Sequence, residues 1–186
     1  RSYLALDLKT QQKVAIKVIL HSNFINDDRA SKRFLRESEV LSTLEHPNIV
    51  HRYAMGIQGN VPYIVMQYVE GIPITEYARQ INKNNWKLNA QLMYKLANAL
   101  AYIHANGIIH RDLKANNILV QADGEPVILD FGLAKKYRSS RTLEQFPFVN
   151  RRKITGTARY ASINALKGYE QSRRDDLEAV GYVLIY

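Results

Sequence analysis

The chain has 186 residues, of which 46% are hydrophobic, so it is long enough to bury the core of one large domain or two small ones. It contains no cysteine, which excludes a disulfide framework and a cysteine-based metal site. The net charge of +9 is confined to residues 133–174, which hold eleven Lys or Arg and two Glu; the other fifteen basic and fifteen acidic residues cancel. This pattern does not fit a general nucleic-acid-coating protein, but the cationic segment could attract an acidic or phosphorylated partner.

The sequence shows no sign of insertion into a membrane. No run approaches the ~18 consecutive apolar residues that a transmembrane helix needs, and the first residues lack the hydrophobic region of a signal peptide. We therefore expect a protein without a membrane span that works in the cytoplasm, with the nucleus as the alternative.

Two strands are predicted at the start of the chain, over residues 3–6 and 13–19, with a polar turn between them. Side chains alternate between two faces along the second strand, so Lys17 shares a face with Ala15 and Ile19. Lys17 is therefore a charge on a face that is otherwise small or apolar.

A helix is predicted over residues 27–45, and its apolar residues repeat as one stripe. Glu37 falls on that stripe, whereas Glu39 falls off it. An unpaired buried charge is strongly destabilising, so a carboxylate on the buried stripe needs a cation. Lys17 is its natural partner.

The middle of the chain alternates strands and helices. The elements predicted there are strands over residues 50–57 and 61–69, a helix over 89–106, a β-hairpin with strands 118–120 and 127–129, and a last helix over 174–186. Asn106-Gly107 is a good C-terminal stop for the helix 89–106. Trp86, just before this helix, is interpreted as a packing residue.

Polar groups surrounded by apolar runs gather in residues 108–132. Asp112 lies in the string HRDLKANN, Asn117 ends that string, and Asp130 opens the string DFG. The predicted hairpin brings Asn117 and Asp130 to the same end of a cleft, where their apolar flanks would hold them at the edge of a core. This pattern predicts a site rather than a solvated loop.

The strings HRDLKANN and DFG, together with VAIK at residues 14–17, resemble the catalytic core of eukaryotic-type protein kinases. The resemblance implies an α+β, two-lobed fold: a small antiparallel β-lobe with one helix over residues 1–66, a hinge over 67–73, and a mainly helical lobe over 74–186. No glycine precedes Gly56, so the glycine-rich loop that covers ATP is absent, and we expect a kinase-domain fragment truncated at both ends. Arg52 departs from the family pattern, because it stands where a core leucine is implied.

The resemblance further implies an ATP-dependent protein kinase that uses Mg²⁺. Asp112 would accept the proton of the substrate hydroxyl, Lys114 would neutralise the transferring phosphate, and Asn117 and Asp130 would bind the metal. Lys17 would hold the α- and β-phosphates. The other residues implied at the nucleotide site are Glu37, Ala15, Met66, Gln67, Val69 and Leu119.

The strings GTARYASINAL and EQSRRDDLEAVGYVL, near the end of the chain, resemble the casein kinase 1 group. Lys114 together with Thr157 is the pairing that marks serine/threonine kinases. Asp176 matches the aspartate that holds the catalytic loop from the helix below it. Ser162 begins the Ser-Ile-Asn that stands where most kinases have Ala-Pro-Glu.

Casein kinase 1 enzymes favour acidic or already phosphorylated protein substrates, and the cationic segment fits such a partner. The residues expected to hold a substrate phosphate are Arg151, Arg152, Lys153 and Arg159. Arg111 would meet a phosphorylated residue of the activation segment, for which the available hydroxyls are Ser139, Ser140, Thr142 and Thr155. His110 and Phe131 are interpreted as packing residues.

Two other classes of function are open alternatives. A catalytically impaired, kinase-like binding module would share the fold, although every residue named for phosphate, metal and base is present. Nucleic-acid binding through the basic segment is disfavoured, because that segment lacks interleaved aromatic residues suited to stacking on bases.

Overall fold

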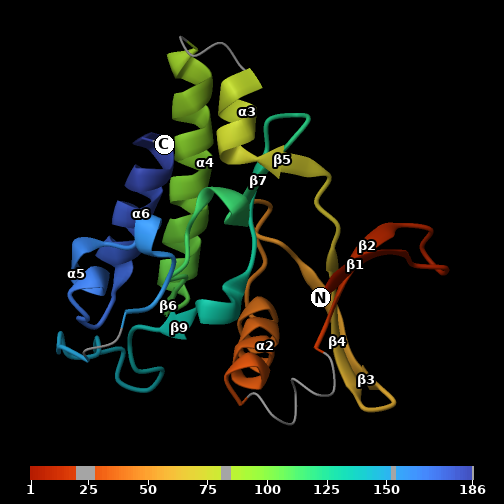
Figure 1. Ribbon diagram of the computed structural model, residues 1–186, viewed down its shortest axis with the longest axis horizontal. Coiled ribbons are helices and arrows are strands. Elements are labelled where there is room, and N and C mark those ends of the chain that lie inside the picture. The colour runs from red at the N-terminus through yellow and green to blue at the C-terminus, as the bar shows by residue number, and fades with distance from the viewer. Residues whose placement is uncertain (20–27, 81–84, 152–153, 186) are drawn as a thin grey trace.

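The amino-terminal lobe is built on a four-stranded antiparallel sheet with the strand order β1-β2-β4-β3. The computed structural model describes residues 1–19, 28–80, 85–151 and 154–185. The strands of this sheet are β1 (Ser2–Leu6), β2 (Lys13–Val18), β3 (Arg52–Gln58) and β4 (Val61–Gln67). Figure 1 shows the sheet on the right, with helix α2 (Asp28–Leu41) on its inner side. All four strands predicted for this lobe are confirmed.

Helix α2 presents the predicted stripe to the interior. Phe34 is buried, Glu37 is 2% exposed and Glu39 is exposed, as the spacing predicts. The helix ends four residues earlier than predicted, because the hydroxyls of Ser42 and Thr43 donate to backbone carbonyls three residues before them and compete with the helical pattern. The predicted first residue, 27, lies outside the described residues.

Arg52 lies at the start of β3, next to a shift in the pairing of β3 with β4 between Arg52 and Ala54. The strand thus slips in register at this position, which removes part of the conflict that an arginine at an apolar position creates. Its Nε atom nevertheless stays buried and has no hydrogen-bond partner among the described residues.

The second lobe is mainly helical and packs around α4 (Trp86–Ala105), whose buried face carries the predicted repeat of Leu92, Leu96, Leu100 and Ile103. Gly107, at φ +77°, follows the helix end as predicted. The remaining elements are α3 (Ile74–Gln80), α5 (Ile163–Leu166) and α6 (Arg173–Ile185), the sheet β5 (Gly71–Pro73), β7 (Ile118–Gln121) and β8 (Pro126–Ile128), the pair β6 (Ile108–Ile109) and β9 (Lys135–Lys136), and the 3₁₀ turns η1 (Ala115–Asn117), η2 (Phe131–Leu133) and η3 (Ala158–Tyr160).

Two expectations for the start of this lobe are wrong. Trp86 is the first residue of α4 and is 69% exposed, so it is not a packing residue. The helix begins three residues before its predicted start because Asn85 caps it, its side-chain oxygen accepting from the amide of Leu88 at 3.2 Å. Helix α3 was not predicted at all, since its seven residues carry only a short apolar pattern.

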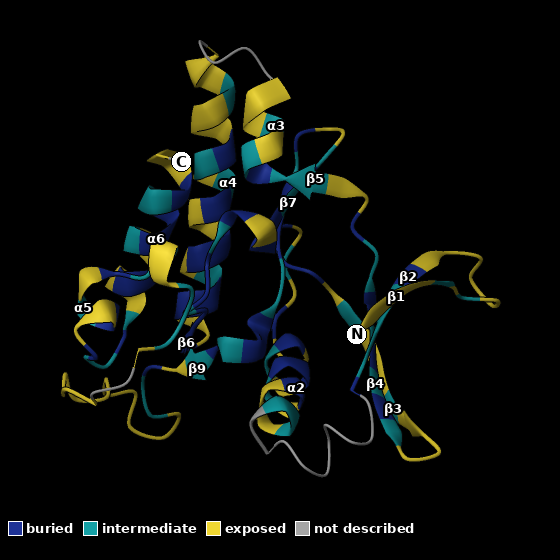
Figure 2. Cartoon of the chain, in the orientation of Figure 1, coloured by how far each residue is buried: buried dark blue, intermediate teal, exposed yellow. Residues whose placement is uncertain are grey.

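The lobes are joined by backbone hydrogen bonds as well as by the chain. Ile128 of β8 donates to the carbonyl of Asn48 at 2.9 Å and accepts from the amide of Val50 at 3.0 Å. Figure 2 shows the buried residues running along α4 and β7 and into α2. The predicted two-lobed α+β fold is therefore confirmed. Within the described ranges, no helix combines the length and apolarity that crossing a membrane requires.

Candidate active site

Asp112 is the centre of a hydrogen-bonded cluster between β6 and η1. Its carboxylate accepts from Thr157 Oγ1 at 2.7 Å and from Lys114 Nζ at 2.9 Å, and Lys114 Nζ also donates to Thr157 Oγ1 at 3.2 Å. Asn117 Nδ2 donates to the carbonyl of Asp112 at 2.9 Å. The cluster brings together residues 45 positions apart in sequence and leaves Asp112 only 9% exposed.

The backbone around Asp112 is held from below by α6. Asp176 accepts from the amides of His110 and Arg111, each at 2.9 Å, and from His104 Nε2 at 2.9 Å. The contact of Asp176 with the catalytic loop is the one that the family resemblance implied. Arg111 has φ +68°, a conformation that side chains rarely adopt, so these two hydrogen bonds hold a strained residue in place.

His110 and Phe131 are buried and meet edge to face, with ring centroids 4.7 Å apart. His110 Nδ1 accepts from the amide of Asp112 at 3.3 Å, so Nε2 is the protonated nitrogen and donates to the carbonyl of Leu129 at 2.9 Å. Both residues therefore pack as predicted, and His110 additionally connects the amide of Asp112 to the carbonyl of Leu129, the residue before Asp130.

Lys17 connects the two lobes. Its Nζ donates to Glu37 Oε2 at 2.5 Å, within the first lobe, and to Asp130 Oδ1 at 3.3 Å, in the second. The sequence predicted the first contact from the helical stripe alone. The side chain of Glu37 is 3% exposed, that of Lys17 27% and that of Asp130 46%, so the pair with Glu37 is the desolvated one.

The charges of this network perturb one another. Burial alone would lower the pKa of Lys17, but Glu37 and Asp130 raise it above its ordinary value. Burial raises the pKa of Glu37 in spite of Lys17. The pKa of Asp130 is lowered: burial acts to raise it, but Lys17 and the amide of Gly132 favour its ionised form more strongly. The lysine thus stays charged, and Glu37 is the carboxyl whose pKa is raised because burial outweighs the neighbouring cation.

Asn117 and Asp130 offer oxygen atoms suited to a magnesium ion. The amide nitrogen of Asn117 is used by Asp112, which leaves its Oδ1 without a hydrogen bond among the described residues, and the same holds for Asp130 Oδ2. Neither Asn117 Oδ1 nor Asp130 Oδ2 is among the fully buried polar atoms that lack a hydrogen-bond partner. Mg²⁺ prefers a few such oxygens and retains several waters, so the donor set fits this ion. No group of three or more His, Cys, Asp or Glu side chains suited to a metal occurs within the described ranges.

The residues predicted around the nucleotide base come from both lobes. Ala15 on β2 pairs with Met66 on β4, and Leu119 lies on β7 of the second lobe. Ala15 and Leu119 are half-buried, as residues facing a cleft would be. The amide of Gln67 donates to the carbonyl of His51 at 2.8 Å, so only its carbonyl oxygen could serve a ligand. Val69 follows in the connection to β5 and is buried.

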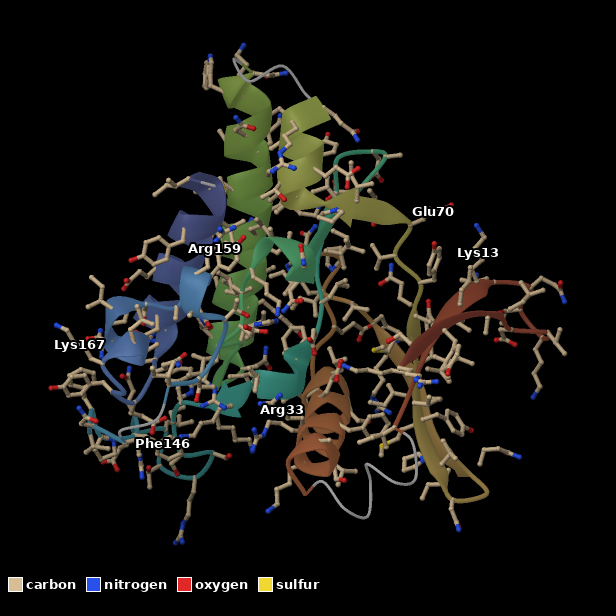
Figure 3. The ribbon with its side chains drawn as sticks, in the orientation of Figure 1. Lys13, Arg33, Glu70, Phe146, Arg159 and Lys167 are labelled. Carbon is tan, nitrogen blue, oxygen red and sulfur yellow. The ribbon has the colours of Figure 1, made fainter. Side chains whose placement is uncertain are left out.

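Of the four residues expected to hold a substrate phosphate, the structure describes Arg151 and Arg159. Arg151 Nε pairs with Glu170 Oε2 at 2.9 Å, and the second oxygen of Glu170 accepts from Lys135 Nζ at 2.6 Å. Arg159 lies on η3, beside α6 and away from Arg33 in Figure 3. Arg152 and Lys153 lie outside the described residues.

A basic groove of about 770 Å³ opens beside Asp112 and Thr157, between α2, the catalytic loop and the activation segment. Its basic lining residues are Lys32, Arg33, Arg36, Arg111, Lys114, Lys135 and Arg151, and its acidic ones are Asp112 and Glu170. The pKa of Arg111 is lowered to about 10, chiefly by burial and then by the neighbouring charge of Arg36. Such crowding of like charges favours an anion between them.

Sequence reasoning missed the contribution of α2 to this groove and of three residues near the start of α6. Arg33 and Arg36 face the groove, but the helical pattern indicates only which face is apolar. Gln171 and Asp175 are buried, and Glu170 is the acceptor for two cations. The spacing Ser172-x-x-Asp175 before a helix is a capping-box signature and could have marked Asp175 in advance.

Comparison with known proteins gives one family and close agreement among relatives. A family model described as the protein kinase domain matches residues 1–186. The chain is 36% identical over 182 residues to serine/threonine-protein kinase PrkC of Bacillus subtilis (strain 168), covering 98% of this chain and 27% of that protein. Probable serine/threonine-protein kinases of Clostridium perfringens and Clostridium acetobutylicum are 35% and 34% identical over the same length, covering 98% of this chain and 26% and 27% of those proteins. The chain thus spans about a quarter of the length of the curated relatives that it matches.

Proposed function

This chain belongs to the protein kinase family, and from that premise we propose that the whole protein is an ATP-dependent kinase that phosphorylates Ser and Thr hydroxyls of other proteins. The observation that carries the proposal is the convergence of two clusters: Lys17, Glu37 and Asp130 form one, and Asp112, Lys114, Thr157 and Asn117 form the other. The amide of Leu129 donates to the carbonyl of Asn117 at 2.8 Å and joins them. Residues 67–73 serve as the hinge between the lobes.

Asp112 is the group that receives the substrate hydroxyl in this proposal. Thr157 and Lys114 occupy its carboxylate oxygens, and an incoming serine or threonine hydroxyl replaces one of these donors. Asp112 would then orient the hydroxyl oxygen towards the γ-phosphorus of ATP and accept the hydroxyl proton, as the new P–O bond forms and the bond between the γ-phosphorus and the leaving ADP breaks. Lys114, which is 25% exposed, stays close enough to neutralise charge on the phosphate.

ATP with Mg²⁺ would supply the phosphoryl group and part of the charge neutralisation. On this chain, Asn117 and Asp130 would hold the metal through the two oxygens described above, and Lys17 would meet the α- and β-phosphates. Glu37 fixes Lys17 from the side away from solvent. Ala15, Met66, Gln67, Val69 and Leu119 would surround the base, with Gln67 acting through its carbonyl.

The decisive test is Asp112→Asn in the whole protein, assayed by transfer of radiolabelled phosphate and by nucleotide binding. We expect transfer to fall by ~10²- to 10⁴-fold, the usual contribution of a positioned general base, while ATP affinity is retained. Full turnover by this variant would remove Asp112 from the role. ATP binding without any transfer by the unmodified protein would instead favour the catalytically impaired binding module.

The substrate preference that we propose is for acidic or already phosphorylated proteins, as the casein kinase 1-like activation segment implies. Support comes from the basic groove, which adjoins Asp112 and carries a large excess of cations. Arg33 and Arg36 have no ion-pair partner among the described residues, so they are available to a phosphate. The site proposed for the phosphate therefore includes α2 as well as Arg151, Arg152, Lys153 and Arg159.

This preference is tested by replacing Arg33 and Arg36 with Gln and comparing peptides with and without phosphoserine. Charged hydrogen bonds contribute about 1.5–3 kcal/mol, so we expect the preference for the phosphorylated peptide to fall by ~10-fold or more. Moving the phosphoserine one residue at a time would show its distance from the acceptor. Arg79→Gln, on the exposed end of α3, is the matched control. An unchanged preference in the double variant would refute the groove as the phosphate site.

A further inference from the structure

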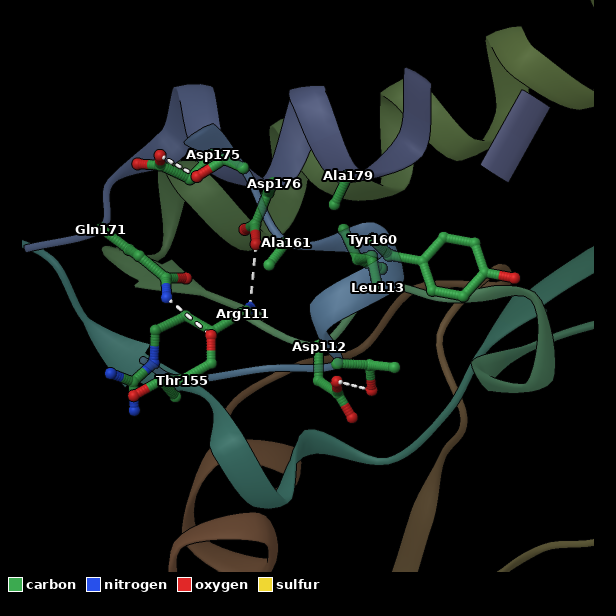
Figure 4. A pocket seen from close by; sticks show the side chains of 12 residues that line it. Arg111, Asp112, Leu113, Thr155, Tyr160, Ala161, Gln171, Asp175, Asp176 and Ala179 are labelled. Carbon is green, nitrogen blue, oxygen red and sulfur yellow. Dashed lines mark hydrogen bonds between the residues drawn. The ribbon is translucent and has the colours of Figure 1, made fainter. Parts of the chain in front are cut away.

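The loop 155–162 contains Thr157, which contacts Asp112, and both ends of the loop are held by residues in or just before the first turn of α6. Gln171 Nε2 donates to the carbonyl of Thr155 at 3.0 Å, and Asp175 Oδ1 accepts from Ser162 Oγ at 2.5 Å. Figure 4 shows Gln171 joined to Thr155, with Asp175 and Asp176 on the helix above the catalytic loop.

These contacts lie out of water, which makes them energetically significant. Ser162 is 1% exposed, Asp175 4% and Gln171 8%. The second oxygen of Asp175 accepts from the amide of Ser172 at 2.6 Å, and Arg174 Nε lies 3.8 Å from it. A buried carboxylate without donors is strongly destabilised, so the position of Asp175 depends on both serines.

Asp175 ties the beginnings of two helices together. Its side chain accepts from the amide of Ser172, which is one of the two contacts of a capping box at the start of α6, and Ser162 is the N-cap of α5, accepting from the amide of Ala165 at 3.1 Å. A capping box needs only the contact within α6. The bond from Ser162 reaches 13 residues along the chain and has a different consequence, because it fixes the end of the loop 155–162.

The middle of the loop needs such fixing, because it crosses the catalytic loop with almost no space to spare. At Gly156, with φ +103°, a Cβ atom would lie 2.6 Å from the carbonyl oxygen of Arg111. The next residue, Thr157, donates to Asp112 at 2.7 Å. A small displacement of the loop would separate Thr157 from Asp112.

We propose that Gln171 and Asp175 are positioning residues that set the loop 155–162 against the catalytic loop, so that Thr157 and Lys114 present a substrate hydroxyl to Asp112. Asp175 and its neighbour Asp176 hold different partners: Asp176 holds the backbone of the catalytic loop, and Asp175 holds the loop that crosses it. The expected effect on peptide phosphorylation rests on the proposed function. The expected effect on the position of the loop 155–162 does not.

The kinetic test uses the whole protein with Asp175→Ala. We expect kcat/KM for a peptide substrate to fall ~10- to 100-fold, the equivalent of one or two lost buried hydrogen bonds, with the KM for ATP changed by less than ~2-fold. Asp175→Asn keeps one acceptor oxygen and should recover part of the loss. Ser162→Ala also removes the N-cap of α5, but the contact that it shares with Asp175 is lost only once, so the loss in the double variant should be smaller than the sum of the two single losses.

The structural test is hydrogen exchange measured on the same variants without substrate. Asp175→Ala should speed exchange of amides in the loop 155–162 and leave those at residues 110–112 protected, whereas Asp176→Ala should affect residues 110–112 first. Glu125→Gln, which removes the half-buried ion pair with Lys95 away from this loop, is the control and should change neither. Hydrogen exchange is independent of phosphate transfer. It therefore distinguishes a failure of Gln171 and Asp175 to position the loop 155–162 from a failure of the proposed function.

Two results would overturn the proposal. One is an equal rise in the KM values for ATP and peptide in Asp175→Ala, which would indicate general loss of structure. The other is unchanged exchange in the loop 155–162, which would leave Asp175 as a helix cap alone. If Asp175→Ala does not fold, Gln171→Leu provides the same comparison at the other end of the loop.

Discussion

The ion pair between Lys17 and Glu37 offers a quantitative test of why the carboxylate stands on a buried stripe. Lys17→Met keeps the length of the side chain and removes its charge. In this variant Glu37, whose side chain is 3% exposed, has lost its cation. The side chain of Asp130 is 46% exposed, so water can solvate its charge. The loss of stability should therefore come from Glu37.

Protonation of Glu37 sets an upper limit on the stability that Lys17→Met loses. A glutamate with an ordinary pKa near 4.3 can avoid burying its charge by taking up a proton, at a free-energy cost of ~3.7 kcal/mol at pH 7 and ~1 kcal/mol at pH 5. Breaking a buried pair costs about 3–5 kcal/mol, so protonation limits the loss at pH 7. Burial already raises the pKa of Glu37, and the variant raises it further. A group whose pKa is raised on folding loses stability as pH rises, so the destabilisation should shrink between pH 7 and pH 5.

The measurement is the free energy of unfolding in urea at the two pH values. Lys95→Met is the matched control, because its partner Glu125 is 40% exposed and the loss should be ~0–1 kcal/mol at both. The double variant Lys17→Met/Glu37→Gln should recover most of the stability at pH 7 without recovering phosphate transfer. A Lys17→Met loss that is equal at pH 5 and pH 7, or no larger than that of Lys95→Met, would refute the reasoning.

Three further predictions concern Gly156, Arg52 and Asp130. Gly156→Ala should lower kcat/KM for peptide by ~10-fold or more, because φ +103° and a contact of 2.6 Å with the carbonyl of Arg111 both oppose a Cβ atom; unchanged steady-state kinetics would contradict this. Arg52→Leu should raise the stability by about 1 kcal/mol, since it removes a buried Nε without a partner, and thermal unfolding against Arg79→Leu on the exposed surface of α3 will show whether it does. Asp130→Asn should raise the Mg²⁺ concentration needed for half-maximal transfer, as measured by titration, and an unaltered requirement would exclude Asp130 as a ligand.

The sequence predicted the parts of the site that depend on local periodicity and on family strings. Glu37 could be chosen over Glu39 because only one of them shares the apolar stripe of α2. The hairpin of β7 and β8 likewise places Asn117 and Asp130 together, since a short turn fixes its register. In each case the decisive relation lies within about 20 residues of sequence.

The parts that were missed are relations between distant segments. Arg36 approaches Arg111 only because α2 packs against η2, and no helical pattern contains that information. Glu170 meets Lys135 and Arg151 from 35 and 19 residues away. Trp86 is interpreted from the sequence as a packing residue, but a residue in the first turn of a helix projects beyond the core unless another element covers it.

Contacts between distant segments also explain why α6 carries two buried acidic residues, Asp175 and Asp176. Arg111 at φ +68° and Asp130 at φ +57° are strained, at a cost of order 1–3 kcal/mol each. The strain at Arg111 is offset by Asp176, 65 residues away, so the catalytic loop cannot hold this shape as an isolated segment. Because the loop 155–162 depends on Asp175 in the same turn of helix, both sides of the Asp112 site depend on the packing of α6. The geometry around Asp112 is therefore a tertiary property, even though Asp112, Lys114 and Thr157 can each be recognised in the sequence.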